Sequence, residues 1–347
     1  MAIKRVVFTM VIALVIGAVL ILLIGESPVD AYAALIRGAF SGKFGFGKTI
    51  AAFTPLLLTS IAFAVAAKAG AFNVGVEGEV FLGGITAAFI GAQFTFLPKP
   101  ILMIACFLGA IVVAGLWALI PAMLKVNWGV SEVCTTILMN TVALYITSYL
   151  VSGPMSAGTA TAQSNPVAVT LPKFMKPSSA NLGIFIAIVV VVLVGLMLYR
   201  TKYGFKIRTV GANPKFADCC GINSKKVFVH SMILSGMLGG IAGCIEVLGV
   251  HGYFLNNFAA GLGTDGMLAA LIARSNVILT PFIAFFLGVL KTGAMGMQQS
   301  TGVPKALIDT ITAIFIIVAT METLFAFKRW KFGKKKDVTI TEGEKSV

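Results

Sequence analysis

The sequence predicts an all-α polytopic membrane protein, and three observations support that prediction. First, 58% of the 347 residues are hydrophobic and only 12% are charged, whereas a soluble domain of this length needs far more surface charge. Second, apolar runs of about 20 residues recur along the chain, the length that crosses a hydrocarbon core of roughly 30 Å. Third, the basic residues gather at the ends of those runs. The net charge of +14 therefore indicates membrane topology and not nucleic-acid binding.

About ten membrane-spanning helices are expected, five of them before the middle of the chain. Lys4 and Arg5 precede the first apolar run, so the first span is expected to enter from the cytoplasm. Pro55 is expected to kink the second span. The five predicted spans are Val6–Ile24, Lys48–Ala67, Asn73–Phe94, Ile101–Leu124 and Ser131–Val151.

The glycine-rich segment Gly25–Gly47 is predicted to be an outer loop between the first two spans. An alternative is that the first apolar run is a cleavable signal peptide, since Asp30–Ala33 offers small residues at a plausible distance. The apolar run is long for a signal peptide, which favours a retained span.

The second half of the chain contains two long polar segments and five further spans. Residues 152–181 carry four prolines and are expected to form an external loop, whereas residues 200–226 carry seven basic residues and one acid and are expected to be cytoplasmic. The tail 331–347 is basic and mixed, so the transmembrane domain is placed at residues 1–330. The five predicted spans are Leu182–Tyr199, Val227–Gly249, Gly263–Ala273, Val277–Met297 and Pro304–Phe327.

The two halves of the chain are expected to form an inverted repeat. Ten spans place both termini in the cytoplasm, and 19 of the 27 basic residues then fall on inner segments. The third predicted span begins with Gly75-Val76-Glu77-Gly78 and the eighth with Gly263-Thr264-Asp265-Gly266. Spans 2–5 would then match spans 7–10 with opposite orientation, as in many transporters.

Polar groups inside an apolar chain are costly and are usually paired or functional. At helical spacing, Asn73 and Glu77 share one face of the third span and Glu79 points away from them. Glu79 is therefore expected to pair with a cation or a helix end. Glu246 and Asp309 are candidate partners for Lys291 or Arg274.

Small residues give the seventh span a face for close helix packing, namely Gly236, Gly239, Gly240 and Gly243.

The cytoplasmic segment 203–222 has a pattern of its own. Lys215–Cys220 is predicted to be a short surface helix, and Asn213 or Ser224 can serve as an N-cap. Two interpretations stay open on residues alone. The segment is either a solvated basic loop or a docking element for a cytoplasmic partner.

Four segments together resemble a known family. They are GAFNVGVEGEVFLGG (70–84), GVSEVCTTILMN (129–140), YGFKIRTVGANPKFADCCGI (203–222) and GTDGMLAALIARSNVILTPFIAFFLGVL (263–290). These segments resemble membrane permeases of ATP-binding cassette (ABC) importers, in the group shared by ribose-type sugar, branched-chain amino acid and nucleoside systems. Within it, Glu132-Val133, Leu138-Met139-Asn140, Gly153-Pro154-Met155 and Gln163-Ser164 look most like the nucleoside branch.

The resemblance implies a permease that binds no nucleotide and needs no cofactor of its own. In such permeases a loop like that at 211–215 docks in a groove of a separate cytoplasmic ATPase. The letters of the pattern GxxxxGK[ST] occur once, at Gly42–Thr49, but they run into a predicted membrane span and are not expected to form a phosphate loop. The chain is therefore expected to be a transport subunit and not an enzyme. The departure from the family pattern is Cys219-Cys220, which stands where small or aromatic residues are commoner. The expected coupling residues are Gly204, Arg208, Gly211, Ala212, Asn213, Pro214 and Lys215.

The expected substrate is a nucleoside, whose hydroxyls and base edges can exchange hydrogen bonds with amide and carboxylate side chains. The alternative for Glu77 and Asp265 is that they only cap broken helices. Five cysteines without metal-ligand spacing and two histidines give no metal site. The residues expected to line the substrate pathway are Asn73, Glu77, Phe81, Glu132, Asn140 and Asp265.

The expected location is the bacterial plasma (inner) membrane. The resemblance implies three protein partners: the cytoplasmic ATPase, a second permease that we expect to be a paralogue, and an external substrate-binding (lipo)protein. One alternative is the same machinery importing a simple sugar such as ribose or galactose. Another is a secondary transporter driven by an ion gradient, for which inverted repeats and buried acids are also typical, but which would not require the segment 203–222.

Overall fold

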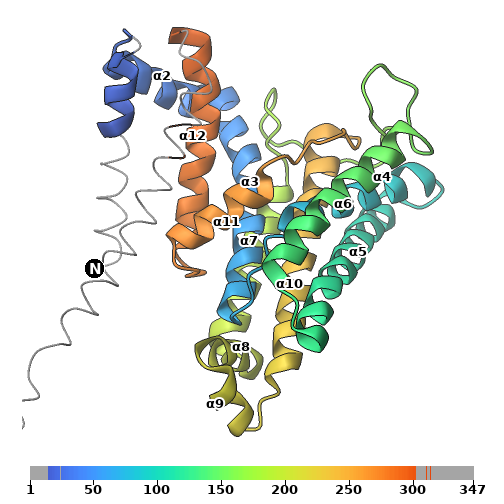
Figure 1. The fold of residues 1–347 in the computed structure, drawn as a ribbon. Helices are drawn as coiled ribbons and strands as arrows, with labels where there is room; N and C mark the ends of the chain where they lie inside the picture. Colours follow the sequence, from blue (N-terminus) through green and yellow to red (C-terminus); the bar gives the residue numbers. More distant parts are fainter. Residues whose placement is uncertain (1–14, 24, 302–309, 311–312, 314–347) are drawn as a thin grey trace, which may run out of the picture. The chain divides into compact units, whose positions relative to one another are not determined.

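The computed structural model describes residues 15–23, 25–301, 310 and 313. The chain divides into two compact units, one formed by Met1–Pro28 with Ala306–Val347 and the other by Val29–Lys305. In the first unit, residues 15–23 are helical. Everything below concerns the second unit, which contains the helix bundle (Figure 1).

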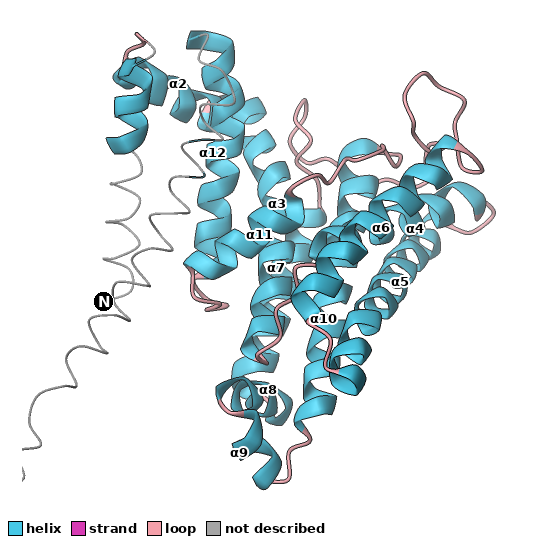
Figure 2. Cartoon of the chain, viewed as in Figure 1, coloured by secondary structure: helices cyan, strands magenta, loops and turns pink. Residues whose placement is uncertain are grey.

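All regular structure in the described residues is helical (Figure 2). The long helices coincide with apolar runs, and the short ones lie at the polar junctions between them. The helices are α2 (Pro28–Phe40), α3 (Gly42–Lys68), α4 (Val76–Gln93), α5 (Lys99–Trp128), α6 (Glu132–Ser152), α7 (Gly183–Arg200), α8 (Lys202–Ala212), α9 (Pro214–Cys219), α10 (Ser224–Ile245), the π-helical η1 (Glu246–His251), α11 (Leu262–Ile272) and α12 (Thr280–Thr301).

Six helices in this described part are long and apolar enough to cross a membrane, or seven if residues 15–23 and α2 together form one bent span. The six are α3, α5, α6, α7, α10 with η1, and α12, and they confirm an all-helical membrane protein. The third and eighth predicted spans are also helices, but α11 is short and α4 carries two acids in its first turn. The tenth predicted span, Pro304–Phe327, lies almost wholly outside the described residues. The number ten and the cytoplasmic termini therefore stay predictions.

The predicted outer loop Gly25–Gly47 is wrong, because α2 covers most of it and α3 begins at Gly42. The buried residues of α2 follow helical spacing (Ala31, Ala34, Leu35 and Ala39), and Asp30 and Arg37 stand at the helix ends that their charges favour. The glycines of Gly25–Gly47 favoured a loop in the prediction, so the helical spacing of its apolar residues was not recognised. The long loop predicted at 152–181 is confirmed as a segment without a helix from residue 153 on.

Residues 164–171 of that loop pair with the chain that follows α10. The amides of Ser164, Val167 and Leu171 donate to the carbonyls of Phe254, Gly252 and Leu248. The amide of Ala168 donates to the carbonyl of Gly91, in the last turn of α4. This loop, at the upper end of the bundle in Figure 2, therefore joins the upper ends of α4 and α10.

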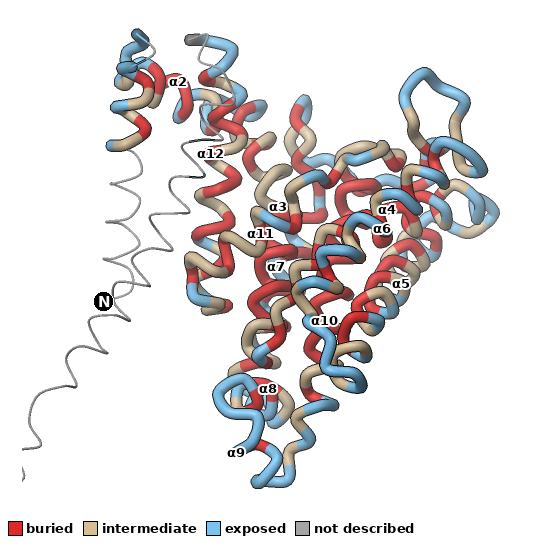
Figure 3. Tube along the Cα trace, in the orientation of Figure 1, coloured by how far each residue is buried: buried red, intermediate tan, exposed pale blue. Residues whose placement is uncertain are grey.

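The core is built around α10, which packs against α3, α4 and α5. Burial is concentrated in α3, α4 and α10, whereas α5, α6 and α7 expose apolar faces suited to lipid (Figure 3). Small residues allow the close approach, since a Cβ on Gly243 would overlap the carbonyl oxygen of Val80 and one on Gly83 would overlap Gly240. The predicted packing face of the seventh span is confirmed.

The packing pairs of the described helices have a symmetry of their own, while the inverted repeat of spans 2–5 and 7–10 stays a prediction. Exchanging α3, α4 and α5 with α10, α11 and α12 turns each of the main packing pairs into another observed pair. The pair α4–α10 becomes α11–α3, α5–α10 becomes α12–α3, and α4–α5 becomes α11–α12. The helices α3 and α10 run in opposite directions, because the end of α3 at Lys68 and the start of α10 both adjoin the segment α8–α9.

Replacing Gly243 by alanine should destabilise the bundle by about 1–3 kcal/mol, since the added methyl group must displace the backbone of α4. The matched control is Gly195→Ala in α7, where a Cβ meets no atom within 4 Å. Thermal unfolding in detergent should show a lower midpoint for Gly243→Ala only. Equal midpoints for the two variants would contradict the packing described here.

Candidate functional site

The start of α4 is held by a buried asparagine. Asn73 lies in the turn before the helix, where it is fully buried. Its Nδ2 donates to Glu79 Oε1 at 2.8 Å and to Ser235 Oγ of α10 at 2.9 Å, and its Oδ1 accepts from the amide of Gly75. The prediction that Asn73 shares a helix face with Glu77 is therefore wrong, because α4 begins only at Val76. Glu79 pairs with an amide and not with a cation.

Glu77 joins the start of α4 to the start of α11. Its Oε1 accepts from the amide of Gly261 at 3.1 Å, and its Oε2 accepts from Thr264 Oγ1 at 3.1 Å. A Cβ on Gly263 would overlap the backbone of Glu77. The two Gly-x-acid-Gly segments noted in the sequence therefore contact each other.

Asn140 of α6 holds the same segment from another side. Its Nδ2 donates to the carbonyl of Val74 at 2.9 Å, and its Oδ1 accepts from the amide of Gly78 at 2.8 Å. We call this cluster the polar junction. It consists of residues 73–79 with Asn140, Ser235, Gly261 and Thr264.

The other acids have partners that the sequence did not predict. Asp265 forms an ion pair with Lys291 of α12, and Glu132 forms one with Lys125 at 2.8 Å. Glu246, an expected partner of Lys291 or Arg274, instead lies 3.7 Å from His251 Nε2. The other expected partner, Asp309, lies outside the described residues.

The polar junction contains three of the six predicted pathway residues, namely Asn73, Glu77 and Asn140, whereas Asp265 pairs with Lys291. The side chains of Glu77, Asn140 and Asp265 are partly exposed, as is that of Glu132 at the start of α6. Phe81 is buried and packs edge-on against Phe258 at a centroid distance of 5.8 Å. Sequence reasoning missed Ser235 and Thr264. Thr264 stands inside the repeated motif and could have been found, whereas nothing in the sequence links Ser235 to Asn73.

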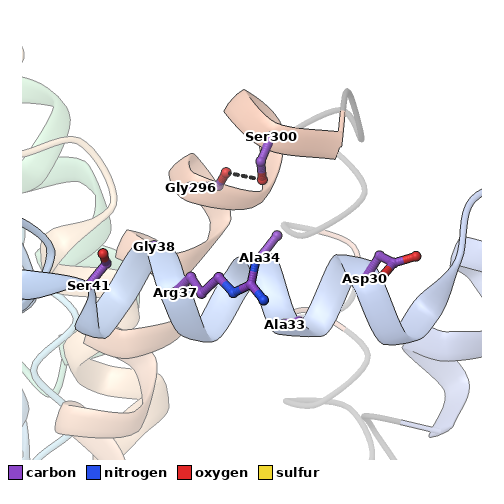
Figure 4. A pocket seen from close by; sticks show the side chains of 8 residues that line it. All are labelled: Asp30, Ala33, Ala34, Arg37, Gly38, Ser41, Gly296 and Ser300. Atoms are coloured by element: carbon purple, nitrogen blue, oxygen red, sulfur yellow. Dashed lines mark hydrogen bonds between the residues drawn. The ribbon is translucent and has the colours of Figure 1, made fainter.

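A cleft of about 420 Å³ lies elsewhere, between α2 and α12. Figure 4 shows Asp30, Arg37 and Ser41 on one side and Gly296 and Ser300 on the other. Ser300 Oγ donates to the carbonyl of Gly296 at 2.8 Å. No predicted pathway residue lines this cleft.

The cytoplasmic segment predicted at 203–222 consists of two short helices at the lower end of the bundle in Figure 1. The helix predicted at Lys215–Cys220 is confirmed as α9, and Asn213 caps it by accepting from the amide of Phe216. The helix α8 was not predicted. Thr201 caps it by accepting from the amide of Gly204.

The other proposed cap, Ser224, is wrong, because Asn223 accepts from the amide of Lys226 and caps α10. Ser224 instead donates its amide and its hydroxyl to the carboxylate of Asp218, both at 2.9 Å. These two bonds lower the pKa of Asp218, the amide contributing most. They hold the end of α9 against the start of α10.

Six of the seven predicted coupling residues are exposed, namely Arg208, Gly211, Ala212, Asn213, Pro214 and Lys215, and Gly204 is buried. At Gly204 and Gly211 a Cβ would overlap backbone carbonyls. For Gly204 these are the carbonyls of Met197 and Leu198 in α7, and for Gly211 it is that of Lys68 at the end of α3.

Replacing Asn140 by leucine should lower the thermal midpoint of the protein, because it leaves the Val74 carbonyl and the Gly78 amide without partners. Both bonds are partly buried, so the cost is at most about 1–3 kcal/mol for each group. Asn140→Asp keeps the acceptor for Gly78 and should lose less. Asn127→Leu, at an exposed position of α5, is the control. If Asn140→Leu melts like the control, the two bonds of Asn140 do not hold α4.

Comparison with known proteins identifies the family. A family model described as the permease component of branched-chain amino acid transport systems matches residues 46–321. The guanosine ABC transporter permease protein NupP of Bacillus subtilis is 32% identical, over 94% of this chain and 95% of its own. The glucose ABC transporter permease protein TsgB13 of Haloferax volcanii is 31% identical, over 94% and 89%. The guanosine ABC transporter permease protein NupQ of Bacillus subtilis is 24% identical, over 69% and 78%. No solved structure matches.

These relatives are transport subunits and not enzymes, in agreement with the apolar helices that make this chain a multi-pass protein of the plasma membrane. The chain belongs to the family of permease components of branched-chain amino acid transport systems, and it is an ABC transporter permease of the nucleoside or sugar type.

Proposed function

We propose that this chain forms half of the pathway through which an ABC importer moves nucleosides into the cell. The polar junction is the observation that carries the proposal. An acid and an amide side chain, Glu77 and Asn140, lie there with partial exposure inside an otherwise apolar bundle. A carboxylate has about four acceptor sites, so Glu77 keeps acceptor capacity for the hydroxyls of a ribose or the amino group of a base. The similarity to a guanosine permease supports the substrate class.

The six pathway residues have different roles in this proposal. Glu77, Glu132, Asn140 and Asp265 are partly exposed and contact the passing solute. Asn73 and Phe81 are buried, and they hold the start and the middle of α4 in place behind that surface. Carboxylates along the pathway disfavour anionic solutes such as nucleotides.

The membrane topology of the proposal has ten spans, an inverted repeat of spans 2–5 and 7–10, and both termini in the cytoplasm. The exchange of packing pairs between α3–α5 and α10–α12 supports the repeat. Residues 1–330 form the transmembrane domain, with the loop 152–181 outside and the segment 200–226 inside. Residues 331–347 form the cytoplasmic tail.

The proposed partners are a cytoplasmic ATPase that docks on residues 203–222, an external substrate-binding protein and a second permease. The exposed residues of α8 and α9 support the docking surface. We favour a paralogue as the second permease, because two different guanosine permease proteins of one bacterium both resemble this chain. ATP is used by the ATPase and not by this chain.

A simple sugar is the second candidate substrate, favoured by the similarity to a glucose permease of 31% identity. A hexose offers hydroxyls to the same carboxylate and amide groups but no aromatic base. Substrate competition separates the two.

The complex purified with its ATPase and binding protein should take up radiolabelled guanosine and adenosine into proteoliposomes when ATP is supplied. Excess unlabelled nucleoside should compete and excess glucose should not. Uptake of hexoses or pentoses alone would overturn the nucleoside assignment. Uptake that needs no ATP and follows a proton or sodium gradient would overturn the ATP-driven mechanism.

Glu77→Gln should lower uptake by at least about tenfold, since losing a hydrogen bond to a charged group costs about 1.5–3 kcal/mol. Thr264→Val removes only the hydroxyl from which Glu77 accepts a hydrogen bond. The carboxylate of Glu77 stays in place. If Glu77 contacts the solute, Glu77→Gln should raise the KM for uptake more than Thr264→Val does. Equal changes in KM in the two variants would mean that Glu77 only links α4 to α11 and does not contact the solute.

A further inference from the structure

We infer that the cleft between α2 and α12 binds the phosphate group of a membrane phospholipid, and that the guanidinium of Arg37 is its main contact. This inference goes beyond the proposed transport function, because it holds whichever solute the permease carries. Three features of the described residues support it: the way in which α2 and α12 cross, a cation without a partner, and an exposed apolar face beside that cation.

Small residues bring α2 and α12 together at one crossing point and leave the cleft open beside it. A Cβ on Gly38 would lie 2.7 Å from the Cα of Gly296, so the two backbones touch there. The side of α2 that lines the cleft carries only the methyl groups of Ala33 and Ala34 between its polar residues (Figure 4). With so little side chain to fill it, an open volume of about 420 Å³ remains.

The polar side chains of α2 that line the cleft include a cation with unused hydrogen-bonding capacity. Arg37 is exposed, and among the described residues its guanidinium has no hydrogen-bond or ion-pair partner. A guanidinium presents five N–H donors in a planar fork that matches the oxygens of a phosphate group. Ser41, one turn further on, makes no capping bond with its side chain, so its hydroxyl can donate to the same phosphate.

An exposed apolar face of α2 lies next to this polar edge. Val29, Ile36 and Phe40 are 77%, 57% and 44% exposed. At about 100° per residue these three side chains fall within about 40° of one another, and Arg37 lies about 80° from their centre. An apolar face beside a basic edge is typical of a helix that lies in the membrane interface, where acyl chains meet headgroups.

The cleft lies at the level of a membrane surface. The helix α2 leads directly into the start of α3, whereas the end of α3 at Lys68 adjoins α8. The 27 residues of α3 span about 40 Å at 1.5 Å per residue, about the thickness of a bilayer with its headgroups. Figure 1 shows α2 and α8 at opposite ends of the bundle. In the proposed topology the end with α2 is external, where the positive-inside rule disfavours basic residues, so the topology signal does not explain Arg37.

The alternative is that Arg37 is only a solvated surface charge, and native mass spectrometry of the purified chain in detergent separates the two. With dioleoylphosphatidylethanolamine as the probe, Arg37→Gln should bind the first lipid about tenfold more weakly than the wild type. The matched control is Lys43→Gln, which removes an exposed cation of the same end that does not line the cleft and should bind like the wild type. Equal affinities in all three proteins, or an equal loss in both variants, would overturn the inference.

Two further ligands identify the group that is bound. Dioleoylglycerol has the same acyl chains without a phosphate, and it should bind equally to the wild type and to Arg37→Gln. Inorganic phosphate in large excess should leave the bound phospholipid in place. A loss of dioleoylglycerol binding in Arg37→Gln would show that the phosphate is not recognised. Displacement of the lipid by inorganic phosphate would assign the cleft to a soluble phosphate compound, and either result would overturn the inference.

A second variant locates the lipid without changing any charge. Ala33→Leu fills part of the cleft at a half-buried position and leaves Arg37 in place. It should also weaken binding of the phosphatidylethanolamine, and the added lipid should then raise the thermal midpoint less than it does in the wild type. Binding as tight as that of the wild type would place the lipid outside the cleft and overturn the inference.

Discussion

The bundle depends on how the amides at the starts of α4 and α11 find acceptors. A buried peptide group without a partner is costly, and lipid offers none. Side chains supply the acceptors here, with Asn140 receiving the amide of Gly78 and Glu77 that of Gly261. Since each of these side chains comes from a different helix than the amide it accepts, satisfying the helix starts also assembles the bundle. The polar groups cannot be exchanged for apolar ones without leaving backbone groups unpaired.

Close packing around α10 follows from the same geometry. Helices that exchange side-chain hydrogen bonds with one another's termini must lie near each other, and the glycines of α10 permit this. Gly239 lies against Glu79, and Gly243 against the backbone of α4. Glycine weakens a helix by roughly 1 kcal/mol relative to alanine, but here it allows contact between main chains that larger residues would prevent.

The sequence was sufficient for the elements whose signal is local. Long apolar runs predicted α3, α5, α6, α7, α10 and α12, and the repeated Gly-x-acid-Gly segments predicted that α4 and α11 begin alike. The sequence was insufficient where two local patterns predict different structures. In α2 and α8 glycine and polar residues obscure an amphipathic helix, and at α10 two adjacent residues, Asn223 and Ser224, could both serve as caps.

The candidate site shows the same division. Glu77 and Asn140 were recognised because a polar residue in an apolar span is costly and is usually paired or functional. Asn73 was recognised for the same reason, but its partner Ser235 was not, since the two residues are 162 positions apart and no spacing rule relates them. The face that Asn73 presents was also mistaken, because the turn before α4 is three residues longer than helical periodicity suggests.

The loop 164–171 gives the pair α4–α10 a second point of attachment. These helices are bonded near the start of α4 through Asn73 and Ser235, and at their upper ends through the amides of Val167 and Ala168. Two helices joined near both ends resist sliding along each other, so the loop 164–171 adds to the rigidity of the pair α4–α10 without adding a helix to the bundle.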